Sequence, residues 1–483
     1  MNPVLRTLAL GFLLAACVPT SSQPYADRAD ALLSAYHEAS LFEGTALVAV
    51  GDSVVFEGSR GVADRSWSIP ITPEARFRIG SVTKPFTAAL VLLLVESGDV
   101  ELDAPLATYI PGYPAPAGEH VTVHHLLAHT SGIPNFTGLP GFDAFERQTH
   151  GTEDLLAFFS GLDLEFEPGS AFRYSNSNYA VLGAIVEAVT GMTYADALQD
   201  RLLHPLGLKD TGYDGGVEVV ARKARGYFRQ GAAFVPEPYV DPSVPSAAGM
   251  LYSTAPDLAR WTRALFGGNV FAQSATLRQM TRAQSGSATS GYGYGLDLAF
   301  RVVDGDTLRQ IGHGGRIGAF QSEHRYLPDQ DWTVITLSNS RGDTNALAND
   351  LVRLLLGAAP ELPDRPVGWA LAARIETDGL DAAARWYQAL LADPDGYDVS
   401  EDQLNALGYV YLGRGEAETA LRVFALNAEA YPGAWNVHDS LGEALAAVGR
   451  RIEAIAAYER SVALNPDNEN GRVMLERLRA DRP

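Results

Sequence analysis

A serine and a lysine, Ser81 and Lys84, stand at a spacing that suits nucleophilic catalysis. A serine hydroxyl is a weak nucleophile at neutral pH and needs a neighbouring base to accept its proton. Residues three apart share one face of a helix, so the Lys84 amine can reach the Ser81 hydroxyl there. A lysine in apolar surroundings has its charged form disfavoured and can serve as that base. The alternative is that Ser81 caps the start of a helix and that Lys84 is exposed to solvent.

The residues around this pair favour the catalytic interpretation. Gly80 precedes Ser81, and a strongly apolar run follows from residue 85 to residue 95 before Gly98. This pattern predicts a buried helix with Ser81 in its first turn. Free backbone N–H groups at such a helix start can stabilise negative charge that develops on a substrate oxygen. Lysine is also rare, because only three of the 37 Lys and Arg residues are lysines.

A second stretch with chemical potential contains Tyr174 and Asn176, between a Pro168-Gly169 turn and an apolar helical segment. A tyrosine hydroxyl beside a cationic lysine can have its phenolate favoured and can transfer protons. An asparagine amide can donate to and accept from a substrate amide. The alternative is a packing tyrosine and an asparagine at a helix start.

A third stretch reads His313-Gly314-Gly315-Arg316 within a strand pattern. Glycines in a strand let a ligand backbone approach closely, although they also fit a bulge at a sheet edge. Elsewhere, His124, His125 and His129 suggest a metal site, but no carboxylate or further histidine stands at ligand spacing. We therefore expect structural histidines, and neither a metal nor another cofactor.

The three stretches, in this order, resemble the motifs of the penicillin-recognising serine hydrolases. The most similar branch comprises class C β-lactamases and their kin: DD-peptidases, D-aminopeptidases and β-lactamase-like esterases. Supporting stretches lie at residues 127–132 (Leu-Ala-His-Thr-Ser-Gly) and 249–254 (Gly-Met-Leu-Tyr-Ser-Thr). The resemblance covers roughly residues 28 to 357, and several motifs agree in order.

The resemblance implies roles for the matching positions. Ser81 would be the acylated nucleophile, Lys84 its base, and Tyr174 the group that protonates the leaving group and later activates water. Asn176 would hold the substrate amide, and the backbone N–H groups of Ser81 and Arg316 would form the oxyanion hole. The substrate-binding strand would comprise the residues His313, Gly314 and Gly315.

One departure from the family pattern concerns His313, because class C β-lactamases have lysine there. An imidazole changes its charge near neutral pH and is a weaker anchor for a substrate carboxylate than an ammonium. We therefore expect inefficient β-lactam hydrolysis, and we expect His313 to face the pocket. Replacing it with lysine is expected to raise β-lactam turnover relative to ester turnover.

The fold class predicted for residues 28–357 is α+β, with an antiparallel sheet flanked by helices and a helical subdomain. Helical spacing extends over residues 27–41, and residues 100–270 are mainly helical with long loops. The hairpin signal Gly51-Asp52 joins the first two strands. Predicted strands are 45–50, 54–59, 294–302, 307–311, 320–327 and 332–337, followed by a helix near 345–356.

Residues 1–17 are typical of an export signal. The short apolar segment ends at Leu14-Ala15-Ala16-Cys17, which resembles the lipobox of bacterial lipoproteins, in which the cysteine is lipidated. An ordinary signal peptide is the alternative. Residues 18–27 would form a tether to a bacterial membrane, and the protein would face the periplasm. Cys17 is the only cysteine, so no internal disulfide can form.

A proline-rich linker at residues 358–366 is followed by a purely helical segment, 367–483. Gly408, Ala420 and Pro432 recur 34 residues later as Gly442, Ala454 and Pro466. This period resembles tetratricopeptide repeats and predicts an α-solenoid. Such repeats would either bind a protein or peptide partner or form a structural cap. Because the linker follows all three motifs, a chain ending near Gly357 is expected to keep its activity.

Taken together, the sequence predicts a lipid-anchored serine hydrolase that acts on a small ester, amide or D-amino-acid peptide. The alternatives are a class C-type β-lactamase and a catalytically weak scaffold whose repeats bind a protein. The net charge of −21 disfavours nucleic acid as a partner.

Overall fold

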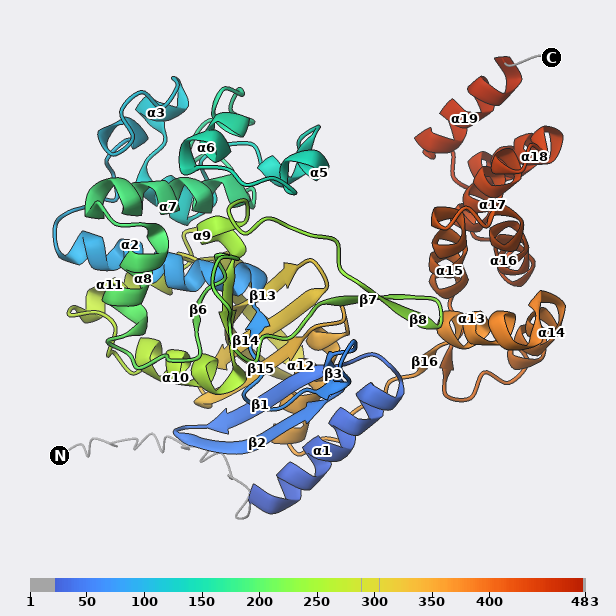
Figure 1. Ribbon diagram of the computed structural model, residues 1–483, viewed down its shortest axis with the longest axis horizontal. Helices are drawn as coiled ribbons and strands as arrows, with labels where there is room; N and C mark the ends of the chain where they lie inside the picture. The colour runs from blue at the N-terminus through green and yellow to red at the C-terminus, as the bar shows by residue number, and fades with distance from the viewer. Residues whose placement is uncertain (1–21, 288, 304, 481–483) are drawn as a thin grey trace, which may run out of the picture.

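The computed structural model describes residues 22–287, 289–303 and 305–480 (Figure 1). The proposed signal segment 1–17 and Cys17 lie outside the described residues. The first helix, α1 (Ser22–Glu38), begins five residues before the expected start. Residues 22–27, which we predicted as part of a tether, are therefore helical. Tyr25 and Ala29 on this helix are buried in an apolar cluster, and this packing accounts for the earlier start.

An eight-stranded sheet forms the centre of the catalytic region. Its strand order is β10-β11-β12-β13-β14-β15-β1-β2, and every neighbouring pair is antiparallel. The predicted antiparallel sheet is thus confirmed. The strands are β1 (Gly44–Val50), β2 (Ser53–Arg60), β10 (Ser285–Gly286), β11 (Ser290–Tyr292), β12 (Asp297–Val303), β13 (Asp306–Ile317), β14 (Phe320–Leu327) and β15 (Trp332–Ser338).

Both faces of this sheet are covered by helices, as the alternation along β1 shows. Leu47 and Ala49 pack into one apolar cluster, whereas Ala46 and Val48 pack into another. Successive side chains of a strand point to opposite faces, so each face contributes to its own core. One core contains α1 and α12 (Thr344–Leu355), and the larger one contains α2 (Thr83–Glu96), α7 (Asn176–Thr190) and α10 (Ala255–Phe266).

A helical subdomain lies beside the sheet, and most of its helices are drawn above α2 in Figure 1. Short helices and long connections alternate there because glycines and prolines interrupt the apolar pattern. Its elements are η2 (Leu106–Thr108), α3 (Ala117–His120), α4 (Val123–Leu127), η3 (Phe136–Gly138), α5 (Phe142–Phe145), α6 (Thr152–Ser160), α7, α8 (Tyr194–Leu198) and η4 (Gln199–Leu203). Within the described ranges no single helix is long and apolar enough to cross a membrane. Helix α7 and residues 194–203, which meet at a bend of 81°, reach the required length and apolar composition only together.

The connection from the subdomain back to the sheet contains several short elements. These are β6 (Gly212–Tyr213), β7 (Tyr227–Gln230), β8 (Ala233–Pro236), α9 (Ser246–Gly249), β9 (Leu251–Ser253) and α11 (Ser274–Met280). Strand β9 pairs with both β5 (Phe77–Arg78) and β6, so it fixes the segment that precedes Ser81. Strands β3 (Val62–Asp64) and β4 (Ile69–Pro70) form a separate pair.

The glycine-rich stretch is part of a strand, as its pattern predicts. The strand expected at residues 307–311 and the glycine-rich segment after it form one continuous strand, β13. Pairing with β12 stops at Gly312, whereas pairing with β14 continues to Ile317. Residues 313–317 therefore present a backbone edge without a β12 partner beside the nucleophile.

The predicted C-terminal helices are present. They are α13 (Val367–Asp378), α14 (Leu380–Leu390), α15 (Glu401–Gly413), α16 (Ala417–Ala430), α17 (Trp435–Ala447), α18 (Arg451–Leu464) and α19 (Glu469–Ala480). Helices α15, α17 and α19 each begin 34 residues after the previous one. A Cβ at Gly408 would lie 2.4 Å from the Phe424 ring, and one at Gly442 would lie 2.9 Å from the Tyr458 ring. Close helix packing thus explains the repeated glycine. Membership of the tetratricopeptide family stays a prediction.

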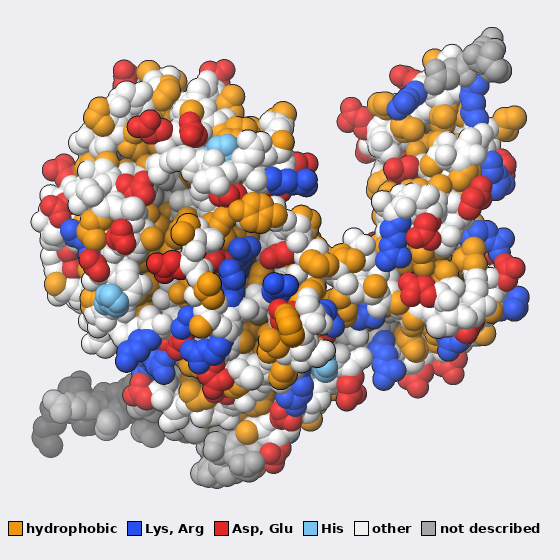
Figure 2. All heavy atoms as spheres, in the orientation of Figure 1, with side chains coloured by type: hydrophobic (Ala, Val, Ile, Leu, Met, Phe, Trp, Pro, Cys, Tyr) orange, Lys and Arg blue, Asp and Glu red, His pale blue; other side chains and the backbone are white. Residues whose placement is uncertain are grey.

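The C-terminal helices contact the catalytic region at the β7–β8 hairpin (Figure 1). The Arg229 guanidinium lies 4.4 Å from the centre of the Trp369 ring, and Arg414 Nη2 donates to Gln230 O at 2.8 Å. Away from this hairpin, Figure 2 shows open space between the later helices and the catalytic region. Short strands β16 (Arg365–Pro366) and β17 (Tyr397–Asp398) pair at the base of the helical region.

Candidate active site

Ser81 and Lys84 lie together at the start of helix α2, as their spacing predicts. Ser81 is in a 3₁₀ turn, Gly80–Val82, which leads directly into α2. Lys84 Nζ lies 3.0 Å from Ser81 Oγ. The Lys84 side chain is fully buried, with a relative exposure of 0%. The alternative of a solvated lysine is therefore wrong.

The partners of Lys84 are compatible with a neutral amine that acts as a base. Besides Ser81, Nζ contacts Asn176 Oδ1 at 2.9 Å and the backbone oxygen of Ala248 at 2.8 Å. Both oxygens can only accept hydrogen bonds. A neutral amine has two N–H groups for these oxygens and one lone pair left for the Ser81 hydroxyl proton. Burial lowers the pKa of Lys84 well below its ordinary value, although the Asp297 carboxylate opposes the shift.

Tyr174 reaches the same serine from the opposite side of the lysine. Its hydroxyl donates to Ser81 Oγ at 2.8 Å, and Lys84 Nζ lies 4.8 Å from the centre of its ring. We expected Lys84 to favour the phenolate, but burial raises the pKa of Tyr174. The Asp297 carboxylate raises it further, because it disfavours a second negative charge nearby. Tyr174 is therefore a protonated hydroxyl that can donate.

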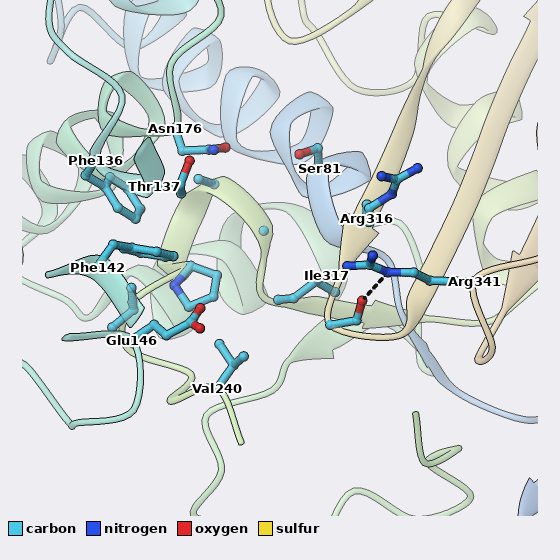
Figure 3. Close-up of a pocket in the computed structure, with 15 residues that line it drawn as sticks. Ser81, Phe136, Thr137, Phe142, Glu146, Asn176, Val240, Arg316, Ile317 and Arg341 are labelled. Atoms are coloured by element: carbon cyan, nitrogen blue, oxygen red, sulfur yellow. Dashed lines mark hydrogen bonds between the residues drawn. The ribbon is translucent and has the colours of Figure 1, made fainter. Parts of the chain in front are cut away.

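Asn176 begins helix α7 and lines the pocket with Ser81. Its Oδ1 is occupied by Lys84, and its backbone N–H donates to Asn135 Oδ1 at 3.0 Å. These contacts fix the side chain so that its amide nitrogen is the group available to a substrate. Figure 3 shows Asn176 on the same side of the pocket as Thr137 and Phe136.

His313 lies near Tyr174, with ring centres 6.0 Å apart, but it does not line the pocket. Its side chain is only 6% exposed. Nδ1 contacts Gly314 O at 2.5 Å and Nε2 contacts the Tyr292 hydroxyl at 3.1 Å, so both ring nitrogens are occupied. Burial lowers the pKa of His313. The strand turns this side chain toward Tyr292, next to Tyr174, and a role for His313 in substrate binding stays a prediction.

The backbone groups of Ser81 and Arg316 are brought together by two glycines. A Cβ on Gly80 would lie 2.6 Å from Arg316 N, and one on Gly315 would lie 2.0 Å from Ile79 O. Only glycine permits this approach, and Gly80 also has a positive φ of 53°. Strand β13 thus contacts the turn that carries the nucleophile. Gly314 lies in the same strand, where it pairs with Glu323 of β14.

A pocket with a volume of about 450 Å³ opens beside Ser81 (Figure 3). Arg316 and Arg341 lie near the serine, and Arg341 Nε donates to Gly318 O at 3.1 Å. The rest of the wall is mostly apolar and comes from the helical subdomain and the segment before α9. Its members include Phe136, Phe142, Val240, Val244, Pro245 and Ala248, with Thr137 and Glu146 as polar groups.

Two residues near the site that sequence reasoning gave no role are His129 and Tyr292. His129 is fully buried; its Nδ1 contacts Ser175 N and Asn178 Nδ2 at 3.2 Å, and its ring centre lies 4.4 Å from that of Tyr174. Tyr292 contacts His313 and packs edge-on against Tyr174. His129 belongs to the stretch 127–132 that supports the family resemblance, so the sequence contained a hint that it lies near the site. The sequence around Tyr292 contained no such hint.

The histidines considered for a metal site have local structural contacts. His124 Nδ1 lies 2.7 Å from the Tyr294 hydroxyl, and His125 Nδ1 accepts from the Thr122 backbone N–H at the start of α4. Among the described residues, no group of three or more His, Cys, Asp or Glu side chains is arranged to hold a metal ion. We derive no metal chemistry for this site.

Comparison with known protein families agrees with this geometry. The family model described as Beta-lactamase matches residues 29–359. The chain belongs to the β-lactamase family. The match includes Ser81, Lys84, Tyr174, Asn176 and the His313 strand, and it ends before helix α13.

Relatives within the β-lactamase family differ in their named activities. The chain is 30% identical to penicillin-binding protein 4 of Amycolatopsis lactamdurans, covering 75% of this chain and 99% of that protein. It is 30% identical to esterase EstB of Burkholderia gladioli, covering 58% and 80%. The solved structure of a D-amino acid amidase from Ochrobactrum anthropi SV3 aligns with a TM-score of 0.59 at 26% identity, covering 68% and 99%.

Proposed function

We propose that this β-lactamase-family protein is a serine hydrolase that works through an acyl-enzyme on an ester, amide or D-amino-acid peptide. One observation carries the proposal. The buried Lys84 amine contacts Ser81 Oγ and two oxygens that can only accept hydrogen bonds. This arrangement directs the lone pair of a neutral amine at the serine proton, as a general base requires.

Acylation then follows from the positions of the three side chains. Lys84 accepts the Ser81 proton while Oγ bonds to the substrate carbonyl carbon, and the carbonyl oxygen becomes an oxyanion. The backbone N–H groups of Ser81 and Arg316 stabilise that oxyanion. The Tyr174 hydroxyl protonates the leaving oxygen or nitrogen as its bond to carbon breaks, and the proton on Lys84 then passes through water to the Tyr174 oxygen.

Deacylation uses the same groups with water in place of the leaving group. Water bonds to the acyl carbon while its proton passes to the neutral Lys84 amine, either directly or through Tyr174, which takes that proton as it gives its own to the amine. The bond to Ser81 Oγ then breaks as Lys84 returns the proton to that oxygen. Asn176 holds the acyl chain through its free amide nitrogen. No oxidant or cofactor takes part in either half of the cycle.

The substrate class is supported by the relatives and by the buried His313. The relatives include proteins named as an esterase, a penicillin-binding protein and a D-amino acid amidase. Class C β-lactamases have lysine where this chain has His313, and this ring is engaged by Tyr292 and Gly314. We therefore propose ester or amide hydrolysis in preference to efficient β-lactam hydrolysis.

A substrate panel tests this function. Short-chain chromogenic esters, D-amino-acid anilides and a cephalosporin are each incubated with the wild-type protein and with Ser81→Ala. We expect turnover of at least one ester or anilide that Ser81→Ala lacks. Turnover that survives in Ser81→Ala, or turnover of the cephalosporin alone, would contradict the proposal.

We also propose that the protein is exported and lipid-anchored through Cys17, with the C-terminal helices free to bind a protein or peptide. Penicillin-binding relatives support export. Labelling of cells with a radioactive fatty acid tests the anchor: the wild-type protein should be labelled and Cys17→Ser should not be.

A further inference from the structure

The catalytic pocket contains an acidic side chain with no assigned role, Glu146. It follows helix α5 and lines the pocket. Figure 3 shows it beside Phe142 and Val240, across the pocket from Ser81 and Arg316. Among the residues that the structure describes, no hydrogen bond or ion pair engages its carboxylate.

The backbone around Glu146 is held firmly, so the point from which its side chain enters the pocket is fixed. Glu146 O accepts from Asp241 N at 2.7 Å, and Thr149 Oγ1 donates to Asp241 Oδ2 at 2.7 Å. The Phe145 and His150 rings stack with their centres 3.6 Å apart. Burial and the neighbouring Asp143 raise the pKa of Glu146, whereas Arg147 lowers it. A bound cation would relieve this unfavourable environment.

The position of Glu146 in the site indicates which part of the substrate it contacts. Ser81, Asn176 and Arg316 line this pocket, whereas Tyr174 does not. Tyr174 is the proton donor to the leaving group, so the leaving group departs on the other side of the serine. The acyl group that stays on Ser81 therefore occupies the pocket.

We propose that the pocket selects acyl groups with an apolar body and a positively charged amine at the far end, which Glu146 binds. This inference rests on the proposed hydrolase function and specifies its substrate class. The apolar wall contacts the body of the chain, and the part-buried carboxylate pairs with the terminal ammonium. Glu146 is thus a specificity residue and takes no part in bond breaking.

Matched pairs of esters test this inference. Ethyl 6-aminohexanoate is compared with ethyl heptanoate, and ethyl 8-aminooctanoate with ethyl nonanoate, by pH-stat titration. For at least one pair, the wild-type protein should prefer the amino ester in kcat/KM. In Glu146→Gln that preference should fall by roughly ten- to a hundredfold, the usual range for a hydrogen bond to a charged group, while the neutral ester is unaffected.

Two further variants make the test specific. Asp143→Asn removes a nearby exposed carboxylate outside the pocket, and it should change the preference by less than about twofold. Glu146→Lys should reverse the preference toward monoethyl pimelate, whose acyl chain ends in a carboxylate. Ser81-dependent hydrolysis with the same preference in wild type and Glu146→Gln would overturn this inference alone. Absence of hydrolysis for every ester and anilide would overturn the proposed function as well.

Discussion

The catalytic region and the C-terminal helical region bury very different side chains. The catalytic region buries charged groups, including Lys84, Asp214 and Asp257 at 0% exposure and Arg325 at 2%. Among the described residues of the helical region, the buried polar side chains are all uncharged: Asn427, Ser440, Ser461 and Asn468. Burying a charge is costly unless partners or function compensate.

This difference indicates where the protein does chemistry. Asp214 has two cationic partners, Arg78 and Lys223, so its burial is compensated by ion pairs. Lys84 has no carboxylate in contact and keeps only neutral hydrogen-bond partners. Its environment is unfavourable for stability but suitable for a base. In the described part of the helical region, residues 367–480, no charged side chain is buried, so packing and surface contacts must account for its role.

The largest effect is expected for Lys84→Met, which fills a similar volume and removes the base. Turnover of a reactive ester should fall by roughly a hundredfold or more, as expected for loss of a general base. Lys209→Met is the matched control, because Lys209 is exposed and lies outside the pocket. If both variants kept turnover within twofold of wild type, Lys84 could not be the base.

His313→Lys should also reduce activity strongly, contrary to the expectation from sequence. A lysine there would place an ammonium in a buried position near Lys84, and it would lose the contacts with Tyr292 and Gly314. We expect ester and β-lactam turnover to fall together, by roughly ten- to a hundredfold. Steady-state kinetics on both substrates decide the question, and a selective gain in β-lactam turnover would restore the sequence-based view.

A smaller effect is expected on the pH dependence of kcat/KM. Because burial depresses the pKa of Lys84, the neutral base persists to pH values well below 10.5, and kcat/KM should fall as pH drops through the depressed pKa. Asp297 raises that pKa, so Asp297→Asn should shift the acid limb to lower pH. Asp329→Asn, in an exposed turn, should leave the limb in place. A shift to higher pH in Asp297→Asn would contradict the assignment of this limb to Lys84.

The smallest effect on chemistry is expected from removing residues 364–483. The pocket residues all precede this segment. Its side chains contact the catalytic region at Arg229 and Gln230 of the hairpin. We expect kcat/KM on a small ester to stay within about threefold, since an exposed cation–π contact contributes only about 0.5–1 kcal/mol. A folded truncated protein with much lower activity would show that the hairpin transmits support from the helices to the pocket.

The sequence predicted the sheet and the Ser81–Lys84 pair because both depend on local periodicity. Strands β1 and β2 alternate, and three-residue spacing on a helix places two side chains together whatever the rest of the fold. Tyr174 was expected in the site because its motif resembles a known one. Its position 2.8 Å from Ser81 Oγ required the structure.

Other features of the site had no local signal. The third partner of Lys84 is the backbone oxygen of Ala248, which lies 164 residues away and which no residue type marks. The burial of His313 depends on where the pairing of β12 with β13 ends and on the ring of Tyr292. Nothing in the sequence distinguishes Glu146 from the other acidic residues. The fold places it across the pocket from Ser81.

Covalent trapping of Ser81 tests the central claim most directly. The wild-type protein is incubated with a fluorophosphonate probe, and its intact mass is measured beside that of Ser81→Ala and Ser170→Ala, an exposed serine. We predict one adduct on the wild-type protein and on Ser170→Ala, and none on Ser81→Ala. Equal labelling of Ser81→Ala, or no adduct on the wild-type protein, would contradict the account.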